Sequence, residues 1–110
     1  MTLKLESKAP PLVASADGVV RVSGTRVTLD TIVYAFRDGA TAEEIVLKYP
    51  SLELADVYTT IAYYLRHRHE VDKYLATRGE ASARIRRDAE ARFAPKGVRE
   101  RLLARKRKGP

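Results

Sequence analysis

Short apolar stripes at helical spacing, separated by a glycine and a proline, constrain the fold of this chain most strongly. Residues 29–36 carry apolar side chains at intervals of three and four, and Gly39 follows where a helix C-terminal cap belongs. Residues 45–49 repeat the pattern before Pro50, which cannot continue a helix. The third stripe, within residues 54–65, consists of Leu54, Val57, Ile61 and Leu65. These segments predict three short helices that bury their apolar faces against one another.

A β-hairpin is predicted ahead of the helices. Residues 12–16 and 19–22 are short apolar runs that flank Asp17-Gly18, a strong signal for a tight turn. Residues 26–29 indicate another short extended piece. Because so small a sheet is not stable alone, it must pack on the helices. The predicted fold is therefore mainly α, with a small N-terminal hairpin and a three-helix core, followed by a long C-terminal helix and a basic tail.

The three helices follow the layout of a helix-turn-helix domain. Thr41 and Glu44 have the spacing of a capping box at the start of the second helix. In this layout residues 54–66 would lie in a DNA major groove. The side chains expected to face bases or phosphates are Thr59, Thr60, Tyr63 and Arg66. Glu53 and Asp56 occupy the end that normally enters the groove, so the pattern alone leaves a DNA-binding domain and a plain three-helix core both open.

The charge of the chain divides it into two parts. The net charge is +7, but residues 1–77 hold nine Lys/Arg and ten Asp/Glu, whereas residues 78–110 hold twelve and four. Gly79 interrupts the apolar pattern at the same place, and a glycine inside a helix costs about 1 kcal/mol relative to alanine. We therefore predict a folded domain over residues 1–77 and a basic interaction tail over residues 78–110 that binds an acidic partner.

The first part of this tail predicts a helix that needs a partner. Residues 80–94 are rich in Ala, Arg and Glu and carry an apolar stripe one residue wide, formed by Ile85, Ala89 and Phe93. A helix with so narrow an apolar face is marginal alone and more stable in an apolar groove. Residues 95–97 break it. We expect residues 80–108 to be largely disordered in isolation and to become ordered on a partner.

Several function classes are not indicated by the sequence. The absence of cysteine excludes disulfides, thiolate metal sites and a cysteine nucleophile, and the longest run without a charged residue is residues 57–65, too short to span a membrane. His67 and His69 lie two apart and would point to different faces of a helix. No catalytic constellation, phosphate loop, metal site or cofactor motif stands out. We therefore expect a protein that is not an enzyme. Because the N-terminus carries no secretory signal, we also expect it to be cytoplasmic.

A series of short motifs resembles the bacterial DUF433 family. The matching residues are Gly24-Thr25-Arg26-Val27-Thr28, Asp38-Gly39, Glu43-Glu44-Ile45, Tyr49-Pro50, Leu52, Val57 and Ala62-Tyr63-Tyr64. They lie in the order and spacing of that family and place the resemblance over residues 12–75. The family is similar to helix-turn-helix antitoxins of VapB type, which are typically encoded beside a PIN-domain or PIN-like ribonuclease toxin.

The resemblance implies a function for each part of the chain. The N-terminal body would form a homodimer and bind operator DNA, and the C-terminal tail would bind the ribonuclease and block it. The expected toxin-binding residues are Arg84, Ile85, Arg87, Ala89, Arg92, Phe93, Arg99 and Arg101. Arg26 has two possible roles, as a DNA contact or as a bridge between backbone carbonyls. A stand-alone transcriptional regulator with a phosphate-binding tail, and an adaptor or enzyme subunit without a nucleic-acid role, are the alternatives.

Overall fold

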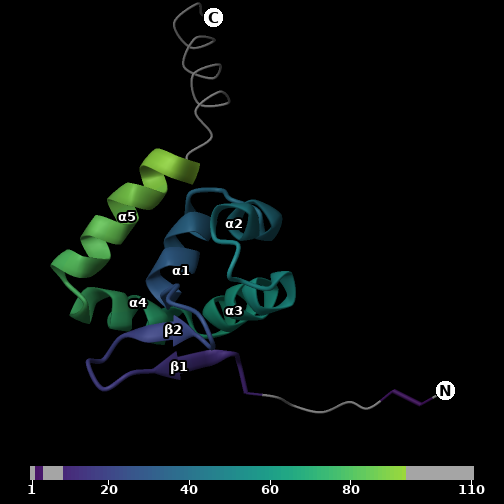
Figure 1. Cartoon of the computed structure of the whole chain (residues 1–110). Coiled ribbons are helices and arrows are strands. Elements are labelled where there is room, and N and C mark those ends of the chain that lie inside the picture. The colour runs from purple at the N-terminus through teal and green to yellow at the C-terminus, as the bar shows by residue number, and fades with distance from the viewer. Residues whose placement is uncertain (1, 4–8, 94–110) are drawn as a thin grey trace, which may run out of the picture.

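The computed structural model describes residues 2–3 and 9–93, which begin with the predicted hairpin. Strands β1 (Leu12–Ala14) and β2 (Val20–Val22) pair in antiparallel fashion (Figure 1). The connection is a loop over residues 15–19 rather than a tight two-residue turn, and Gly18 adopts φ 81° within it. A single bridge between Arg21 and Thr28 is the remaining trace of the expected third extended piece.

The three predicted helices follow the hairpin. They are α1 (Leu29–Arg37), α2 (Ala42–Lys48) and α3 (Leu54–Arg66). The capping box at the start of α2 is confirmed: the Glu44 backbone N–H donates to Thr41 Oγ1 and the Thr41 backbone N–H donates to a Glu44 carboxylate oxygen. Gly39, at φ 95°, takes the left-handed conformation that ends α1. The N-cap of α3 is Glu53, whose side chain makes no capping hydrogen bond.

Two further helices complete the described part of the chain. Helix α4 (Arg68–Thr77) follows α3 after a break at His67, and α5 (Glu80–Phe93) follows α4 after Gly79, at φ 55°. Helix α5 runs back along α1 toward α2 (Figure 1). The mainly helical fold with an N-terminal hairpin is therefore confirmed.

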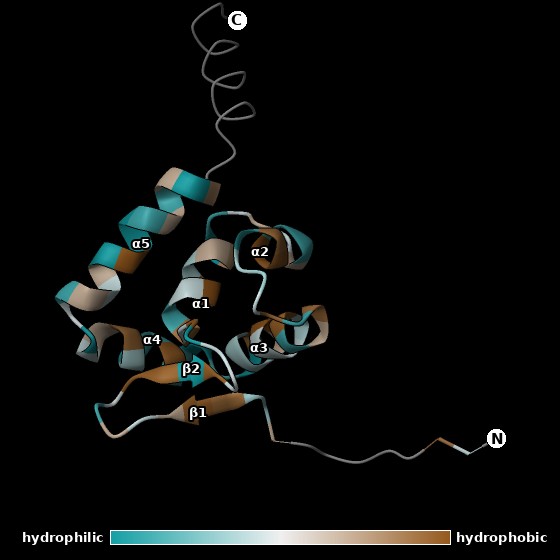
Figure 2. Cartoon of the chain, in the orientation of Figure 1, coloured by the Kyte–Doolittle hydropathy of each residue, from teal (hydrophilic) through white to brown (hydrophobic). Residues whose placement is uncertain are grey.

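Helix α1 contributes residues to two clusters of buried apolar side chains; Figure 2 shows the hydropathy along the helices and strands that form them. The first cluster joins α1 to β2, α2 and α3 and consists of Val22, Ile32, Ala35, Ala40, Ala42, Ile45, Leu52 and Val57. The second joins it to α3, α4 and α5 and consists of Leu29, Val33, Tyr34, Tyr64, Val71, Leu75 and Ala89. Phe93 packs against both clusters. The core thus depends on α5 as well as on the three predicted helices.

The predicted buried face of α3 is partly wrong. Val57 is buried as expected, but Leu54 and Leu65 are 40% and 47% exposed, and Thr60 and Tyr64 are buried instead. Thr60 can be buried because its hydroxyl donates to the Asp56 carbonyl at 2.7 Å. Tyr64 packs edge-on against a ring of α1, Phe36, at a centroid distance of 6.3 Å. The helix is therefore rotated relative to the stripe of aliphatic residues.

Polar contacts tie the segment after residue 77 to α1, so the structure corrects the boundary predicted at Gly79. The Asp30 carboxylate is fully buried and accepts hydrogen bonds from Arg78 Nε at 2.8 Å and from the Tyr74 hydroxyl at 3.1 Å. Tyr34 and Ser82 share a buried hydrogen bond of 3.0 Å between their hydroxyls. The first pair anchors the junction of α4 and α5, and the second anchors α5 itself. The folded body therefore extends at least to Phe93.

Candidate nucleic-acid interface

Helices α2 and α3 and the turn between them form a helix-turn-helix arrangement. The turn covers residues 49–53, and Leu52 within it is buried against α1 and Val57. Its backbone N–H donates to the carbonyl of Tyr49, the C-cap residue of α2. This packing fixes the direction of α3 relative to α2 and leaves one long side of α3 exposed to solvent.

Three of the predicted DNA-binding residues lie on one exposed side of α3. Thr59, Tyr63 and Arg66, spaced by four and three residues, are here called the α3 stripe. With Pro10, Ala62 and His67 they line a shallow hollow of about 360 Å³. Thr59 and Arg66 are exposed, while Tyr63 is half-buried: it packs against the second cluster and its ring stacks on His67 at a centroid distance of 4.3 Å. Such a stripe offers hydroxyl groups and a guanidinium to a ligand.

Two of the predicted DNA contacts do not join this stripe. Thr60 is fully buried and its hydroxyl is satisfied within α3, so the prediction that it contacts DNA is wrong. Arg26 lies in the loop between β2 and α1 and is exposed. Within the described residues it makes no hydrogen bond or ion pair, so the expected bridge to backbone carbonyls is absent. Its other predicted role, as a phosphate contact, stays a prediction.

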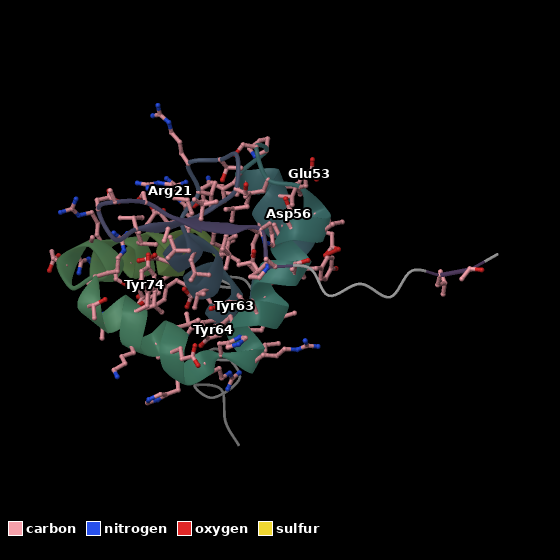
Figure 3. All side chains as sticks on the ribbon, turned by 90° about the horizontal axis from the view of Figure 1, so that it is seen from below. Arg21, Glu53, Asp56, Tyr63, Tyr64 and Tyr74 are labelled. Carbon is pink, nitrogen blue, oxygen red and sulfur yellow. The ribbon has the colours of Figure 1, made fainter. Side chains whose placement is uncertain are left out.

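The beginning of α3 is acidic, as the sequence indicated. Glu53 and Asp56 lie at one end of the helix and Tyr63 farther along it (Figure 3). Glu43 of α2 adds a third carboxylate, which accepts hydrogen bonds from the Tyr58 hydroxyl at 2.7 and 3.0 Å. This hydrogen bond lowers the pKa of Glu43, so the carboxylate stays ionised at neutral pH. Negative charge therefore accumulates at the end of α3 that would lead into a DNA groove.

Exposed apolar side chains, which the sequence pattern did not predict, accompany this charge. Leu47 of α2 is 82% exposed, and Leu54 and Tyr58 of α3 are also exposed. Leu47 lies outside the inward apolar stripe of α2, which consists of Ile45, Val46 and Tyr49, and this signal could have identified it as a surface residue. Leu54 is predicted to be buried because it shares helical spacing with Val57 and Ile61.

The apolar residues assigned to toxin binding face the core of the chain itself. Ala89 is 4% exposed, and Ile85 and Phe93 pack against the second cluster. Helix α1 and Tyr49 provide the apolar groove that was expected on a partner; the rings of Tyr49 and Phe93 lie 6.4 Å apart. Burial raises the pKa of Tyr49. The prediction that this stripe becomes ordered only on a partner is therefore corrected.

The arginines of α5 lie on its outer side, and most are paired within the helix. Arg87 bonds Glu80 at 3.0 Å and Arg92 bonds Asp88 at 2.9 Å, and the latter contact is a helical ion pair. Arg84 is exposed and makes no hydrogen bond or ion pair of its own within the described residues. Arg99 and Arg101 lie outside the described residues. Of the predicted toxin-binding arginines that the structure describes, Arg84 is thus the one whose guanidinium makes no direct hydrogen bond or ion pair, although its charge acts on Glu80.

We also searched the described residues, 2–3 and 9–93, for a metal site and for a membrane-spanning helix. No group of three or more metal-binding side chains lies together there. None of the helices described is both long and apolar enough to cross a membrane.

Comparison with known proteins gives a family match over part of the chain. The structure defines a structural class: a mainly helical protein with an N-terminal hairpin and a helix-turn-helix arrangement. Residues 15–64 match the family model described as "Protein of unknown function (DUF433)". The matched segment runs from the hairpin to the end of α3, which supports the resemblance to the DUF433 family. No curated protein and no solved structure matches the chain.

Proposed function

We propose that the chain is the antitoxin of a type II toxin–antitoxin system, a cytoplasmic inhibitor without catalytic activity of its own. Its basic C-terminal segment neutralises a PIN-type ribonuclease, and its helix-turn-helix unit binds operator DNA. The observation that carries the proposal is the separation of charge: residues 94–110 hold seven Lys/Arg and one Glu, beyond a folded body that pairs most of its arginines. The similarity of the family's motifs to those of VapB-type antitoxins points to the same assignment, although the matching family model itself describes proteins of unknown function.

The ribonuclease half of the proposal rests on the chemistry of arginine. A PIN-type active site is a cluster of carboxylates that holds a divalent metal to activate water. The planar guanidinium binds a carboxylate through two parallel hydrogen bonds and so competes with the metal, whereas lysine cannot reproduce this geometry. Arg84, Arg99 and Arg101 are the candidates, because Arg87 and Arg92 are already paired with carboxylates of α5.

Substitution by lysine tests this mechanism. Arg84→Lys, Arg99→Lys and Arg101→Lys are made singly and together, and the cleavage of RNA by the co-purified ribonuclease is followed at increasing concentrations of each variant. We expect at least one substitution to weaken inhibition tenfold or more. Arg37→Lys, at an exposed arginine of α1, is the matched control and should inhibit like the wild type. Full inhibition by the triple variant would overturn the arginine mechanism.

The DNA half rests on the α3 stripe. Because the start of α3 is acidic, we expect Thr59, Tyr63 and Arg66 to contact bases and phosphates with the later turns of the helix. The body carries few unpaired cations, so specific binding must come from two half-sites bound by a dimer. Fluorescence anisotropy on the DNA upstream of the gene should show a loss of affinity of tenfold or more when the three residues become alanine. The control is Lys73→Ala, at an exposed residue of α4; unchanged affinity in the triple variant would show that α3 is not the DNA-binding helix.

A stand-alone transcriptional regulator is the second candidate, favoured by the same stripe on the helix-turn-helix unit. In that protein the basic segment would bind DNA phosphates as interchangeable charges. The lysine variants above would then leave the affinity for DNA unchanged, and no ribonuclease would co-purify with the chain. Substitution of Arg99 and Arg101 by glutamine would instead weaken DNA binding and lower its dependence on salt.

A further inference from the structure

Four of the large apolar side chains left exposed lie on the two helices of the helix-turn-helix unit. Leu47, Leu54 and Tyr58 are 82%, 40% and 52% exposed and are here called the α2–α3 apolar face; Leu65 continues along α3. Tyr58 reaches α2 through its hydrogen bonds to Glu43, so the two helices contribute to one surface. Exposed apolar residues gathered on one surface of a small protein mark a site of interaction.

The charge around this face is negative. Glu43, Glu44 and Glu53 are exposed around it and Asp56 is half-buried, against a single cation on these two helices beside the face, Lys48. DNA would be repelled by these carboxylates. A second copy that presented the same face would bring like charges together, which is unfavourable at an interface. The face therefore fits a segment that is both basic and apolar.

The chain itself contains such a segment. Residues 94–110 carry a net charge of +6 from seven Lys/Arg and one Glu, together with Val98, Leu102 and Leu103. They begin directly after Phe93, whose ring packs on Tyr49 at the C-terminal end of α2. Seventeen residues can span up to about 56 Å, and a helix of the length of α3 is only about 20 Å long. The segment therefore starts near the C-terminal end of α2, one of the two helices that carry the face, and is long enough to reach the face and cover it.

We infer that residues 94–110 dock on the α2–α3 apolar face of the same chain. Lysines and arginines of the segment pair with the carboxylates of Glu43, Glu53 and their neighbours, while its apolar side chains cover Leu47 and Leu54. This contact shields the beginning of α3 and holds the basic segment until a partner takes it. The inference goes beyond the proposed function and does not depend on it, since it concerns only contacts within one chain.

A spin label at the end of the full-length chain tests the contact. Because the protein has no cysteine, Gly109→Cys gives a single site for a nitroxide label. We expect the amide NMR signals of residues 43–58 to lose more than half of their intensity, while those of residues 68–73 on α4 keep theirs. In 1 M salt, where the Debye length is about 3 Å, the loss should become much smaller.

Two variants and one mixture decide the outcome. Leu47→Ser and Glu53→Lys change exposed residues and should each restore most of the lost intensity, whereas Val13→Ser, at an exposed apolar residue of β1, should not. An even loss over the whole domain, or no loss, would overturn the inference. Unlabelled ¹⁵N-protein mixed with spin-labelled natural-abundance protein should show no broadening. Broadening in this mixture would contradict docking in the same chain and assign the face to the tail of a second copy.

Discussion

Removal of the guanidinium of Arg78 should destabilise the fold far more than removal of an exposed arginine. In Arg78→Met, the methionine keeps much of the length of the side chain but leaves the fully buried Asp30 carboxylate with one neutral donor, the Tyr74 hydroxyl. Breaking a buried ion pair by removing one partner costs about 3–5 kcal/mol. Because the Arg78 side chain is 14% exposed, water can reach part of the vacated space, so we expect the lower end, about 3 kcal/mol.

Urea denaturation followed by circular dichroism measures this loss. With a slope of about 2 kcal/mol per molar urea, the unfolding midpoint should fall by about 1.5 M. Arg37→Met is the matched control, because Arg37 lies 3.9 Å from Asp72 and both side chains are about half exposed. Its free energy of unfolding should change by less than about 1 kcal/mol.

A double variant separates the orphaned charge from lost packing. In Asp30→Asn/Arg78→Met no charge remains buried, so the double variant should be more stable than Arg78→Met alone. The reasoning would be refuted if Arg78→Met resembled Arg37→Met. It would also be refuted if the double variant lost as much stability as the two single variants combined.

Three further outcomes follow from the structure. Ala89→Arg should lower the free energy of unfolding by about 1–3 kcal/mol, because the side chain faces α1, and an unchanged urea midpoint would contradict the packing of α5. Burial raises the pKa of Tyr74, so its contribution to stability is fully present below its ordinary value near 10 and is lost as the pH rises through the raised value. In urea denaturation the wild type should therefore lose more stability than Tyr74→Phe as the pH rises above about 10. The outer edge of β1 is unpaired within the described residues, and the backbone N–H of Ala14 points toward it because the hairpin bonds run through residues 13 and 15. Light scattering should therefore give a dimer mass for the full chain and a monomer mass for Ala14→Pro; a monomeric wild type would contradict pairing through this edge.

The sequence predicted those elements whose signals are local. The capping box of Thr41 and Glu44, the break at Pro50 and the hairpin around Gly18 all depend on residues a few positions apart. The rotation of α3 escaped prediction because a threonine hydroxyl can be satisfied by the carbonyl one turn back, which allows Thr60 into the core. Apolar spacing alone favoured Leu54 instead.

The place of α5 could not be predicted because its partners are distant in sequence. Gly79 was interpreted as the end of the folded body, but in the left-handed conformation it turns the chain back onto α1. Nothing in the local pattern indicates that Asp30 pairs with Arg78, or that Tyr34 bonds Ser82, each across 48 positions. The one-residue-wide apolar stripe was correctly recognised as needing a groove, but the groove belongs to the same chain.

The most direct test of the proposed function is inhibition of a PIN-type ribonuclease, which the proposal expects to be encoded beside this gene. Purified ribonuclease cleaves a labelled RNA, and the full-length protein is added from substoichiometric to excess amounts. The proposal predicts that cleavage stops near equimolar protein, and that a variant with Arg84, Arg99 and Arg101 changed to glutamine inhibits at least tenfold less well. Undiminished cleavage at a large excess of the folded wild-type protein would contradict the assignment as an antitoxin.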